Sequence, residues 1–160
     1  MKIKVGINGM GRIGRMILRS IIESNNKNIE IKHINNRTNS EACCALLKYD
    51  SIHGKFKADI NFDDKHLIIN QNKISFSQET DLNNIKWNKY NVDYVFECTG
   101  KFNSKDQLEP HLRNGAKKVI VSAPCKNADK TIVFGVNESQ LKKVIKLFLL
   151  HLVLLIVLHQ

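Results

Sequence analysis

A glycine-rich turn at residues 9–14, Gly-Met-Gly-Arg-Ile-Gly, is the feature that most constrains the fold of this chain. A short apolar run, residues 3–7, leads into the turn, and apolar residues at helical spacing follow it over residues 11–24. A G-x-G-x-x-G sequence that ends a strand and opens a helix is the context in which this motif binds a dinucleotide. Together with a strand expected over residues 28–34, these elements predict a βαβ unit, the building block of a parallel sheet.

The three glycines of the turn have different expected roles. Gly9 permits the tight turn, Gly11 lets the backbone approach a pyrophosphate, and Gly14 lets the helix pack closely on the strand. The N-terminus of the following helix offers free N–H groups and the positive end of its dipole to an anion. We therefore predict a pyrophosphate subsite at this turn. The alternative is a glycine-rich turn without a ligand.

Predicted strands and helices alternate along the rest of the chain. Strands are expected over residues 93–97, 117–124 and 131–137, and helices over residues 40–50 and 104–114. Ser40 is the expected N-cap of the first helix, and Ser104 and Gln107 are expected to form a capping box on the second. Residues 55–76 alternate apolar and polar residues around turn signals, which predicts inserted antiparallel hairpins. The expected fold is a Rossmann-type α/β domain with a doubly wound, mainly parallel sheet.

The composition excludes several classes of protein. Hydrophobic residues make up 42% of the chain and charged residues 25%, which is typical of a globular domain rather than a disordered chain. The net charge of +10 comes from lysines spread along the chain, so we expect nonspecific attraction to polyanions and no specific nucleic-acid site. The four cysteines form no C-x-x-C pair and no zinc-like pattern, and the N-terminus is too polar for a signal peptide. These features favour reduced thiols, no metal site and a cytoplasmic location.

The residues after the second expected strand bear on the choice of cofactor. Dinucleotide-binding domains usually carry an acidic residue about 20 positions after the glycine motif, where it holds the adenine ribose hydroxyls. Here Asn36 and Arg37 follow the strand. Asn36 can bond a hydroxyl without repelling a 2′-phosphate, and Arg37 can attract one. NAD is the expected cofactor, NADP or use of both is the alternative, and Arg37 could instead be a solvated surface residue.

Five blocks of sequence resemble phosphorylating glyceraldehyde-3-phosphate dehydrogenase. They are VGINGMGRIGR (5–15), LLKYDSIHGKF (46–56), ECTGKF (97–102), GAKKVIVSAP (115–124) and ADKTIVFGVN (128–137), in the family's order and spacing. The resemblance covers residues 1 to about 143 and implies the nucleotide-binding half of a glycolytic oxidoreductase. Such an enzyme transfers a hydride from a thiohemiacetal to a nicotinamide, and phosphate then cleaves the acyl-enzyme to give 1,3-bisphosphoglycerate.

The resemblance also assigns residues to the cofactor site. Arg12 and Ile13 match the family's pyrophosphate contacts. Asn36 stands where the family usually has Asp, which leaves the choice between NAD and NADP open. Thr80 occupies a position beside the adenine where Arg or Lys is common.

On the nicotinamide side, Thr99 and Gly100 match the stretch that lines the cofactor, with Cys98 in place of the usual Ser. Ser122 matches the residue near the nicotinamide end. For Thr99 and Ser122, the alternative is that each hydroxyl only caps the end of a strand. Cys98 and Cys125 end strands near the cofactor edge, where a thiol would be reactive only if its pKa were lowered.

The family's catalytic segment, Ser-Cys-Thr-Thr-Asn-Cys, is expected near residue 150, but residues 144–160 form an apolar run instead. Its apolar stretch, Leu147 to Leu158 interrupted by His151, is short for a membrane span, and a buried core helix is disfavoured because leucine, valine and isoleucine all round leave no polar face. Codons chosen for residues 151–160 and shifted by one base spell Ala-Ser-Cys-Thr-Thr-Asn-Cys-Leu-Ala-Pro, which points to loss of one A in the codons of Lys142 and Lys143. We therefore expect a dinucleotide-binding domain over residues 1–143 and an out-of-frame apolar tail over residues 144–160.

Taken together, the sequence predicts a chain that binds a dinucleotide and is inactive by itself. The catalytic cysteine and histidine and the substrate-phosphate sites belong to a half of the family's fold that is not in this sequence. Family members form homotetramers, and we expect this chain not to; no membrane partner is expected. The alternatives are a relative that oxidises erythrose 4-phosphate, a stand-alone dinucleotide-binding module, and a nucleic-acid binder that uses the positive charge.

Overall fold

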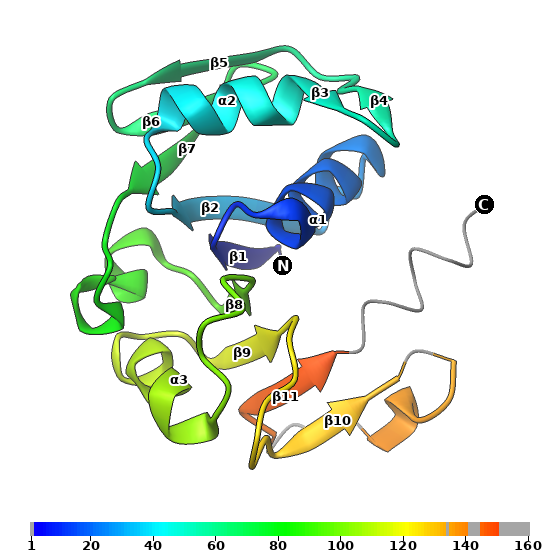
Figure 1. Ribbon diagram of the computed structural model, residues 1–160, viewed down its shortest axis with the longest axis vertical. Helices are drawn as coiled ribbons and strands as arrows, with labels where there is room; N and C mark the ends of the chain where they lie inside the picture. The colour runs from blue at the N-terminus through cyan, green and yellow to red at the C-terminus, as the bar shows by residue number, and fades with distance from the viewer. Residues whose placement is uncertain (1, 134, 141–144, 151–160) are drawn as a thin grey trace.

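A computed structural model describes residues 2–133, 135–140 and 145–150 of the chain. Within these residues the main feature is a nine-stranded sheet in the order β10-β11-β9-β8-β1-β2-β7-β6-β5 (Figure 1). β1 (Ile3–Asn8) lies between β2 (Ile29–Asn35) and β8 (Tyr94–Glu97) and is parallel to both. The predicted Rossmann-type, mainly parallel α/β fold is confirmed.

The segment predicted to form antiparallel hairpins does so, and it extends the same sheet. β5 (Ile60–Asp63) pairs antiparallel with β6 (His66–Ile69), and β6 pairs antiparallel with β7 (Asn72–Ser77). β7 in turn lies parallel to β2. The insertion therefore adds three strands to one side of the parallel core.

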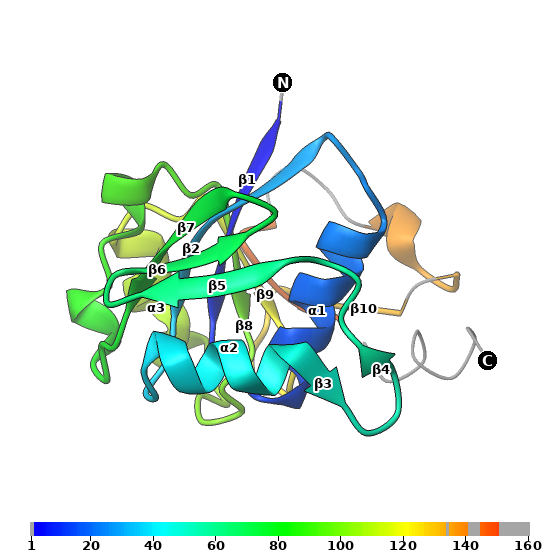
Figure 2. The same cartoon turned by 90° about the horizontal axis from the view of Figure 1, so that it is seen from above.

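One face of the sheet is covered by two helices, α1 (Arg12–Glu23) and α2 (Ser40–Lys48), as Figures 1 and 2 show. α2 leads into a separate small hairpin of β3 (Tyr49–Asp50) and β4 (Gly54–Lys55). The core on this face contains the fully buried side chains Ile7, Leu18, Ile34, Leu47 and Leu67. Alternate residues of the strands thus face the two helices.

The opposite face carries α3 (Lys105–Arg113) and two short 3₁₀ helices, η1 (Leu82–Asn84) and η2 (Trp87–Tyr90). Trp87 is fully buried there and packs on the backbone of Gly6 in β1. A Cβ atom at Gly6 would lie 2.5 Å from the indole ring, so only glycine leaves room for it. The helices on both faces make the sheet doubly wound, as expected.

The predicted N-cap of α2 is wrong by one residue. Asn39 is the N-cap, and its side chain accepts the N–H of Ala42 at 2.9 Å. The hydroxyl of Ser40 instead donates to the carbonyl of Asp63 at 2.7 Å. Ser40 therefore ties α2 to the inserted hairpin, a partner that local sequence does not reveal.

The predicted capping box of α3 is also wrong. Ser104 is the N-cap, but its side chain makes no capping hydrogen bond. The side chain of Gln107 accepts the N–H of Asn103 at 3.0 Å, one residue before the position that a capping box requires. The strand predicted over residues 131–137 is shorter than expected, because β10 (Lys130–Ile132) ends early and a 3₁₀ helix, η3 (Glu138–Gln140), follows.

The last described strand lies within the segment predicted as an apolar tail. β11 (Leu147–Leu150) runs parallel between β9 (Lys118–Val121) and β10. The carboxylate of Asp129 accepts the N–H groups of Lys146 and Leu147 at 3.2 and 3.0 Å and so holds the start of this strand. Residues 151–160 lie outside the described part of the chain. None of the helices in the described part is long and apolar enough to cross a membrane.

His33 of β2 is a fully buried histidine on the side of η2. Its ring stacks on Tyr90 with a centroid distance of 3.8 Å and meets the edge of Trp87 at 5.5 Å. Its Nε2 lies 2.9 Å from the hydroxyl of Ser77. Burial, helped by the nearby Lys89 ammonium, lowers the pKa of His33 to about 4. The folded chain therefore holds this imidazole neutral at neutral pH.

We predict that His33 makes the free energy of unfolding fall as the pH is lowered from about 6.5 to about 4. The unfolded chain binds a proton in this range and the folded chain does not, so the loss is roughly 3 kcal/mol. Denaturant titrations at several pH values, on the wild-type chain and on His33→Phe, measure this contribution. The variant should have a shallower pH dependence, and equal slopes in the two proteins would contradict the prediction.

Candidate functional site

The glycine turn joins β1 to α1 through a close contact between backbone atoms. Gly9 has a φ of 94° and donates its N–H to the carbonyl of Asn35 at 2.8 Å. A Cβ atom at Gly14 would lie 2.0 Å from the carbonyl oxygen of Gly9. A side chain at this position is therefore excluded, and the absence of one allows the first turn of α1 to lie against the end of β1.

The N-terminus of α1 is open toward solvent. Gly11 is its N-cap and makes no side-chain capping bond, and the first turn of the helix contains no acidic residue. A Cβ atom at Gly11 would meet nothing within 4 Å. The first N–H groups of a helix have no intrahelical partner and carry a partial positive charge. Arg12 and Ile13, the two predicted pyrophosphate contacts, are the first residues of this turn; Arg12 is exposed and Ile13 half-buried.

A hairpin beside the turn supports Arg12. The Arg12 guanidinium lies 3.9 Å from the carboxylate of Asp50, which accepts the N–H groups of His53 and Ile52 at 2.9 Å each. These backbone hydrogen bonds, with smaller contributions from the side chains of His53 and Arg12, hold the pKa of Asp50 well below its usual range. Asp50 therefore stays ionised and organises the turn between β3 and β4.

A cavity of about 110 Å³ lies next to the glycine turn, at the carboxyl ends of β1 and β2. Its walls come from four segments of the chain, with the lining residues Asn8, Gly9, Asn35, Asn36, Arg37, Glu79, Thr80, Leu82, Thr99, Lys101 and Phe102. The carboxyl edge of the strands is where open α/β sheets bind ligands. Five of the predicted site residues line this cavity, namely Gly9, Asn36, Arg37, Thr80 and Thr99.

Asn36 connects the end of β2 to the glycine turn. Its Oδ1 accepts the N–H of Met10 at 2.9 Å, and its Nδ2 donates to the hydroxyl of Thr38 at 2.6 Å. The same nitrogen lies 3.2 Å from the sulfur of Cys43. The amide is therefore engaged with the protein itself, whereas the neighbouring Arg37 is exposed at the rim of the cavity.

The predicted residues of the nicotinamide side lie at the ends of β8 and β9. Thr99 donates both its N–H and its hydroxyl to Oε1 of Glu97, at 2.9 and 2.5 Å. Gly100 follows with a φ of 67° and is exposed. Ser122 donates its N–H and its hydroxyl to the carbonyl of Glu97 at 3.0 and 3.1 Å and does not line the cavity. The hydroxyls of Thr99 and Ser122 thus both bond to Glu97, at the end of β8.

Several residues of the cavity were not among the predicted ones. They are Asn8, Asn35, Glu79, Leu82, Lys101 and Phe102. Asn8 and Asn35 are the last residues of β1 and β2 and pair with each other in the sheet. A polar residue at the end of a buried strand is a signal for such a position, but it becomes informative only when the register of the strands is known.

None of the four cysteines has the environment of a nucleophile. All four are free, and burial raises the pKa of each thiol, in the case of Cys98 to about 12. At neutral pH each thiol is therefore held in its protonated form, which is the poorer nucleophile. Within the described part of the chain, no cluster of three or more His, Cys, Asp or Glu side chains could hold a metal ion.

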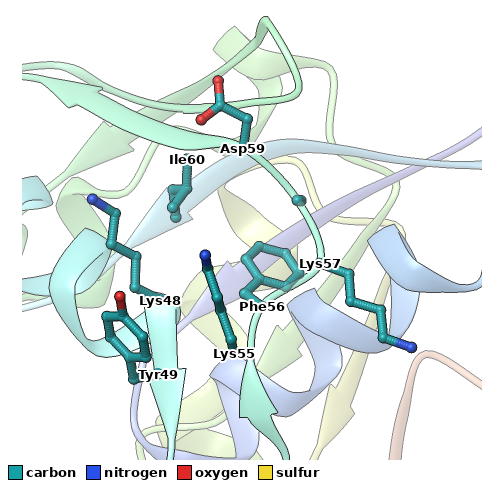
Figure 3. A pocket seen from close by; sticks show the side chains of 8 residues that line it. Lys48, Tyr49, Lys55, Phe56, Lys57, Asp59 and Ile60 are labelled. Carbon is teal, nitrogen blue, oxygen red and sulfur yellow. The ribbon is translucent and has the colours of Figure 1, made fainter.

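A larger cavity of about 590 Å³ lies between the end of α2, the β3–β4 hairpin and the start of β5 (Figure 3). Lys48, Lys55 and Lys57 line it, together with Tyr49 and Asp59. In Figure 3 the amino group of Lys57 points away from those of Lys48 and Lys55, so the three cations do not converge. This cavity shares no lining residue with the one beside the glycine turn, and we assign it no ligand.

Comparisons with known proteins show which family the chain resembles. Residues 3–105 match the sequence profile of a family described as "Glyceraldehyde 3-phosphate dehydrogenase, NAD binding domain". Relatives named glyceraldehyde-3-phosphate dehydrogenase from Geobacillus stearothermophilus, Bacteroides fragilis and Thermotoga maritima are each 44% identical to this chain. The matches cover 88%, 86% and 87% of this chain and 41%, 41% and 42% of those relatives. The chain thus spans about two-fifths of the length of the curated relatives it matches.

Two glycine substitutions should separate the structural part of the turn from its binding part. Gly14→Ala forces a methyl group into the carbonyl of Gly9 and should lower the free energy of unfolding by roughly 3 kcal/mol. Gly11→Ala meets no neighbour and should cost less than about 1 kcal/mol, but should weaken dinucleotide binding at least about tenfold. Thermal unfolding and calorimetric titration measure the two effects. Equal stability losses in both variants would show that the turn is packed differently.

Proposed function

The chain belongs to the glyceraldehyde 3-phosphate dehydrogenase family, and from that membership we propose that it binds NAD as the dinucleotide-binding part of a phosphorylating dehydrogenase. The observation that carries the proposal is the uncapped N-terminus of α1, with Gly11 open to solvent and Gly14 packed on Gly9. A pyrophosphate there would receive hydrogen bonds from the N–H groups of Arg12 and Ile13. This is the geometry in which an anion is stabilised without a salt bridge.

The donor set of the neighbouring cavity suits the adenosine half of the cofactor. Polar walls from Asn36, Arg37 and Thr80 meet apolar walls from Leu82 and Phe102. A ribose offers hydroxyls to the polar side, and an adenine offers a flat apolar surface to the other. Ligand sites in proteins combine apolar walls with a few fixed polar groups in this way.

Bound NAD would accept a hydride on its nicotinamide ring, and the residues of this chain would hold and orient it. We propose that Thr99 and Gly100 line the path of the cofactor and that Ser122 lies near its nicotinamide end. The oxidation of an aldehyde through a thiohemiacetal also needs a thiolate. Because burial raises the pKa of all four cysteines, none of them is suited to that role. We propose that the chain by itself binds the cofactor without turning over glyceraldehyde 3-phosphate.

The preference between NAD and NADP depends on Asn36 and Arg37. The amide of Asn36 carries no charge, so a 2′-phosphate is not repelled, and the exposed Arg37 guanidinium at the rim could pair with one. The Oδ1 atom of Asn36 is engaged with Met10 in the same way that a carboxylate oxygen could be. An aspartate at this position would therefore keep the bond to the glycine turn and add a negative charge.

Titration with NAD and NADP in the same buffer tests the cofactor proposal. We expect saturable binding of NAD by the wild-type chain. Arg37→Ala should weaken NADP at least about fivefold and leave NAD within about twofold, because only the 2′-phosphate meets the guanidinium. Asn36→Asp should raise the ratio of NAD to NADP affinity at least about tenfold. Absence of saturable binding of either cofactor by the folded wild-type chain would refute the proposed function.

We further propose that residues 144–160 are out of frame with respect to the family. The support is that codons compatible with residues 151–160 can be chosen so that, shifted by one base, they spell a segment with the family's catalytic cysteine. On this proposal the continuous reading frame encodes a longer chain that contains the nucleophile and the surfaces of a homotetramer. Strand β11 would then be built from residues that replace the family's own strand at the same place.

Sequencing the gene across the codons of Lys142 to Lys146 tests this proposal. We expect the frame one base away to encode Ser-Cys-Thr-Thr-Asn-Cys and to continue as a dehydrogenase. A gene with one A restored in the codons of Lys142 and Lys143 should produce a protein that oxidises glyceraldehyde 3-phosphate with NAD, and the 160-residue chain should not. If the shifted frame lacks the cysteine segment, the proposal is wrong.

A further inference from the structure

A buried chain of hydrogen bonds runs beneath the dinucleotide cavity, across four adjacent strands of the sheet. It begins at His33 and Ser77, passes through Asn35, Asn8 and Glu97, and ends at His111 and Trp87. Asn8, Asn35, Glu97 and His111 are each less than 4% exposed. Four of these contacts join residues that are 27 to 89 positions apart in the sequence.

The backbone of Glu79 sets the direction of the chain at one end. The Oδ1 atom of Asn35 accepts the N–H of Glu79 at 2.8 Å, and the Nδ2 atom of Asn35 donates to the carbonyl of Glu79 at 2.9 Å. Since backbone groups cannot exchange donor for acceptor, the amide of Asn35 has one orientation. Its Nδ2 also donates to Oδ1 of Asn8 at 2.8 Å, which leaves Nδ2 of Asn8 to donate to Oε2 of Glu97 at 2.6 Å.

The indole of Trp87 sets the direction at the other end. An indole N–H can only donate, and that of Trp87 lies 2.9 Å from Nδ1 of His111. The neutral His111 imidazole therefore carries its proton on Nε2, which lies 2.8 Å from Oε2 of Glu97. Both ends of the chain thus direct donors toward the same carboxyl group.

Glu97 receives four donors on two oxygens. Asn8 and His111 donate to Oε2, and the N–H and the hydroxyl of Thr99 donate to Oε1. Only a carboxylate accepts on both oxygens; an amide would place its NH₂ group against donors. A buried polar group whose partners are mismatched in this way is strongly unfavourable.

We propose that Glu97 is a positioning residue of the cofactor site, which fixes Asn8 and Thr99 as two walls of the cavity and couples them to Trp87. The inference rests on the proposed binding of NAD at this cavity. The N–H and the hydroxyl of Thr99 both donate to Glu97, so the hydroxyl oxygen of Thr99 can only accept a hydrogen bond from a ligand. The turn at residues 98–100, which follows β8, is thereby fixed through Thr99 by a single buried carboxylate.

The main test compares Glu97→Gln with Glu109→Gln, an exposed carboxylate on the same helix as His111. Glu97→Gln should weaken NAD at least about tenfold in calorimetric titration and shift the emission of Trp87, the only tryptophan of the chain. Glu109→Gln should change the affinity for NAD by less than about twofold and leave the emission of Trp87 unchanged. If Glu97→Gln binds NAD as the wild-type chain does, Glu97 is not a positioning residue.

A double-mutant cycle with Trp87→Phe separates positioning from a general loss of stability. Without the indole N–H, His111 can move its proton to Nδ1 and accept at Nε2 from the amide of Gln at position 97. Trp87→Phe should therefore weaken NAD less in the Glu97→Gln background than in the wild-type background. Equal effects in the two backgrounds would mean that the two residues act independently, and the proposed coupling would be wrong.

Two measurements on the cofactor-free wild-type chain do not depend on NAD binding or on a variant that folds. Nitrogen chemical shifts should show the Nε2–H tautomer of His111, and the amide of Thr99 should exchange slowly with solvent. The Nδ1–H tautomer, or a rapidly exchanging Thr99 amide, would overturn the inference. If both measurements agree with it and the wild-type chain nevertheless binds no NAD, the proposed function fails while the arrangement around Glu97 stands.

Discussion

The contact between Gly14 and the carbonyl of Gly9 is the constraint on which the rest of the structure depends. It brings the first turn of α1 against the end of β1, and this close approach is possible only because position 14 has no Cβ atom. The helix axis then leads away from the carboxyl edge of the sheet with its N-terminus left at that edge. β2 returns parallel to β1, so Asn8 and Asn35 end side by side. The polar floor of the cavity follows from this one backbone contact.

Much of the architecture follows from local patterns, because those patterns report which residues face the core. The glycine motif, the apolar strands and the hairpins of residues 55–76 are local features, and the structure contains each of them. The wrong N-cap of α2 shows how a distant partner competes for a side chain. The hydroxyl of Ser40 does not cap α2 because it donates to the carbonyl of Asp63, 23 residues away. The parallel pairing of β7 with β2 likewise depends on where the insertion folds back, and no local signal specifies that.

The same distinction applies to the site. Gly9, Asn36, Arg37, Thr80 and Thr99 were predicted from motif and resemblance, and they line one cavity. Glu97 and His111 were not predicted, since their importance lies in a hydrogen-bond chain that no single segment contains. Gly6 belongs to the same class: its sequence context is that of an ordinary strand residue, but in the structure the indole of Trp87 packs on it. Such roles depend on strand register and layer packing, which the sequence does not display.

The order of the last three strands has a consequence for how the chain is made. β11 lies between β9 and β10 although it is the last of the three to be synthesised. On the ribosome the N-terminal parts of a chain form first. β10 would therefore emerge before β11, the strand with which it pairs in the sheet. A gap one strand wide must stay open beside β9 until residues 147–150 arrive. Cotranslational assembly therefore completes this side of the sheet last, and until then the edge of β9 is open to pairing with a foreign strand.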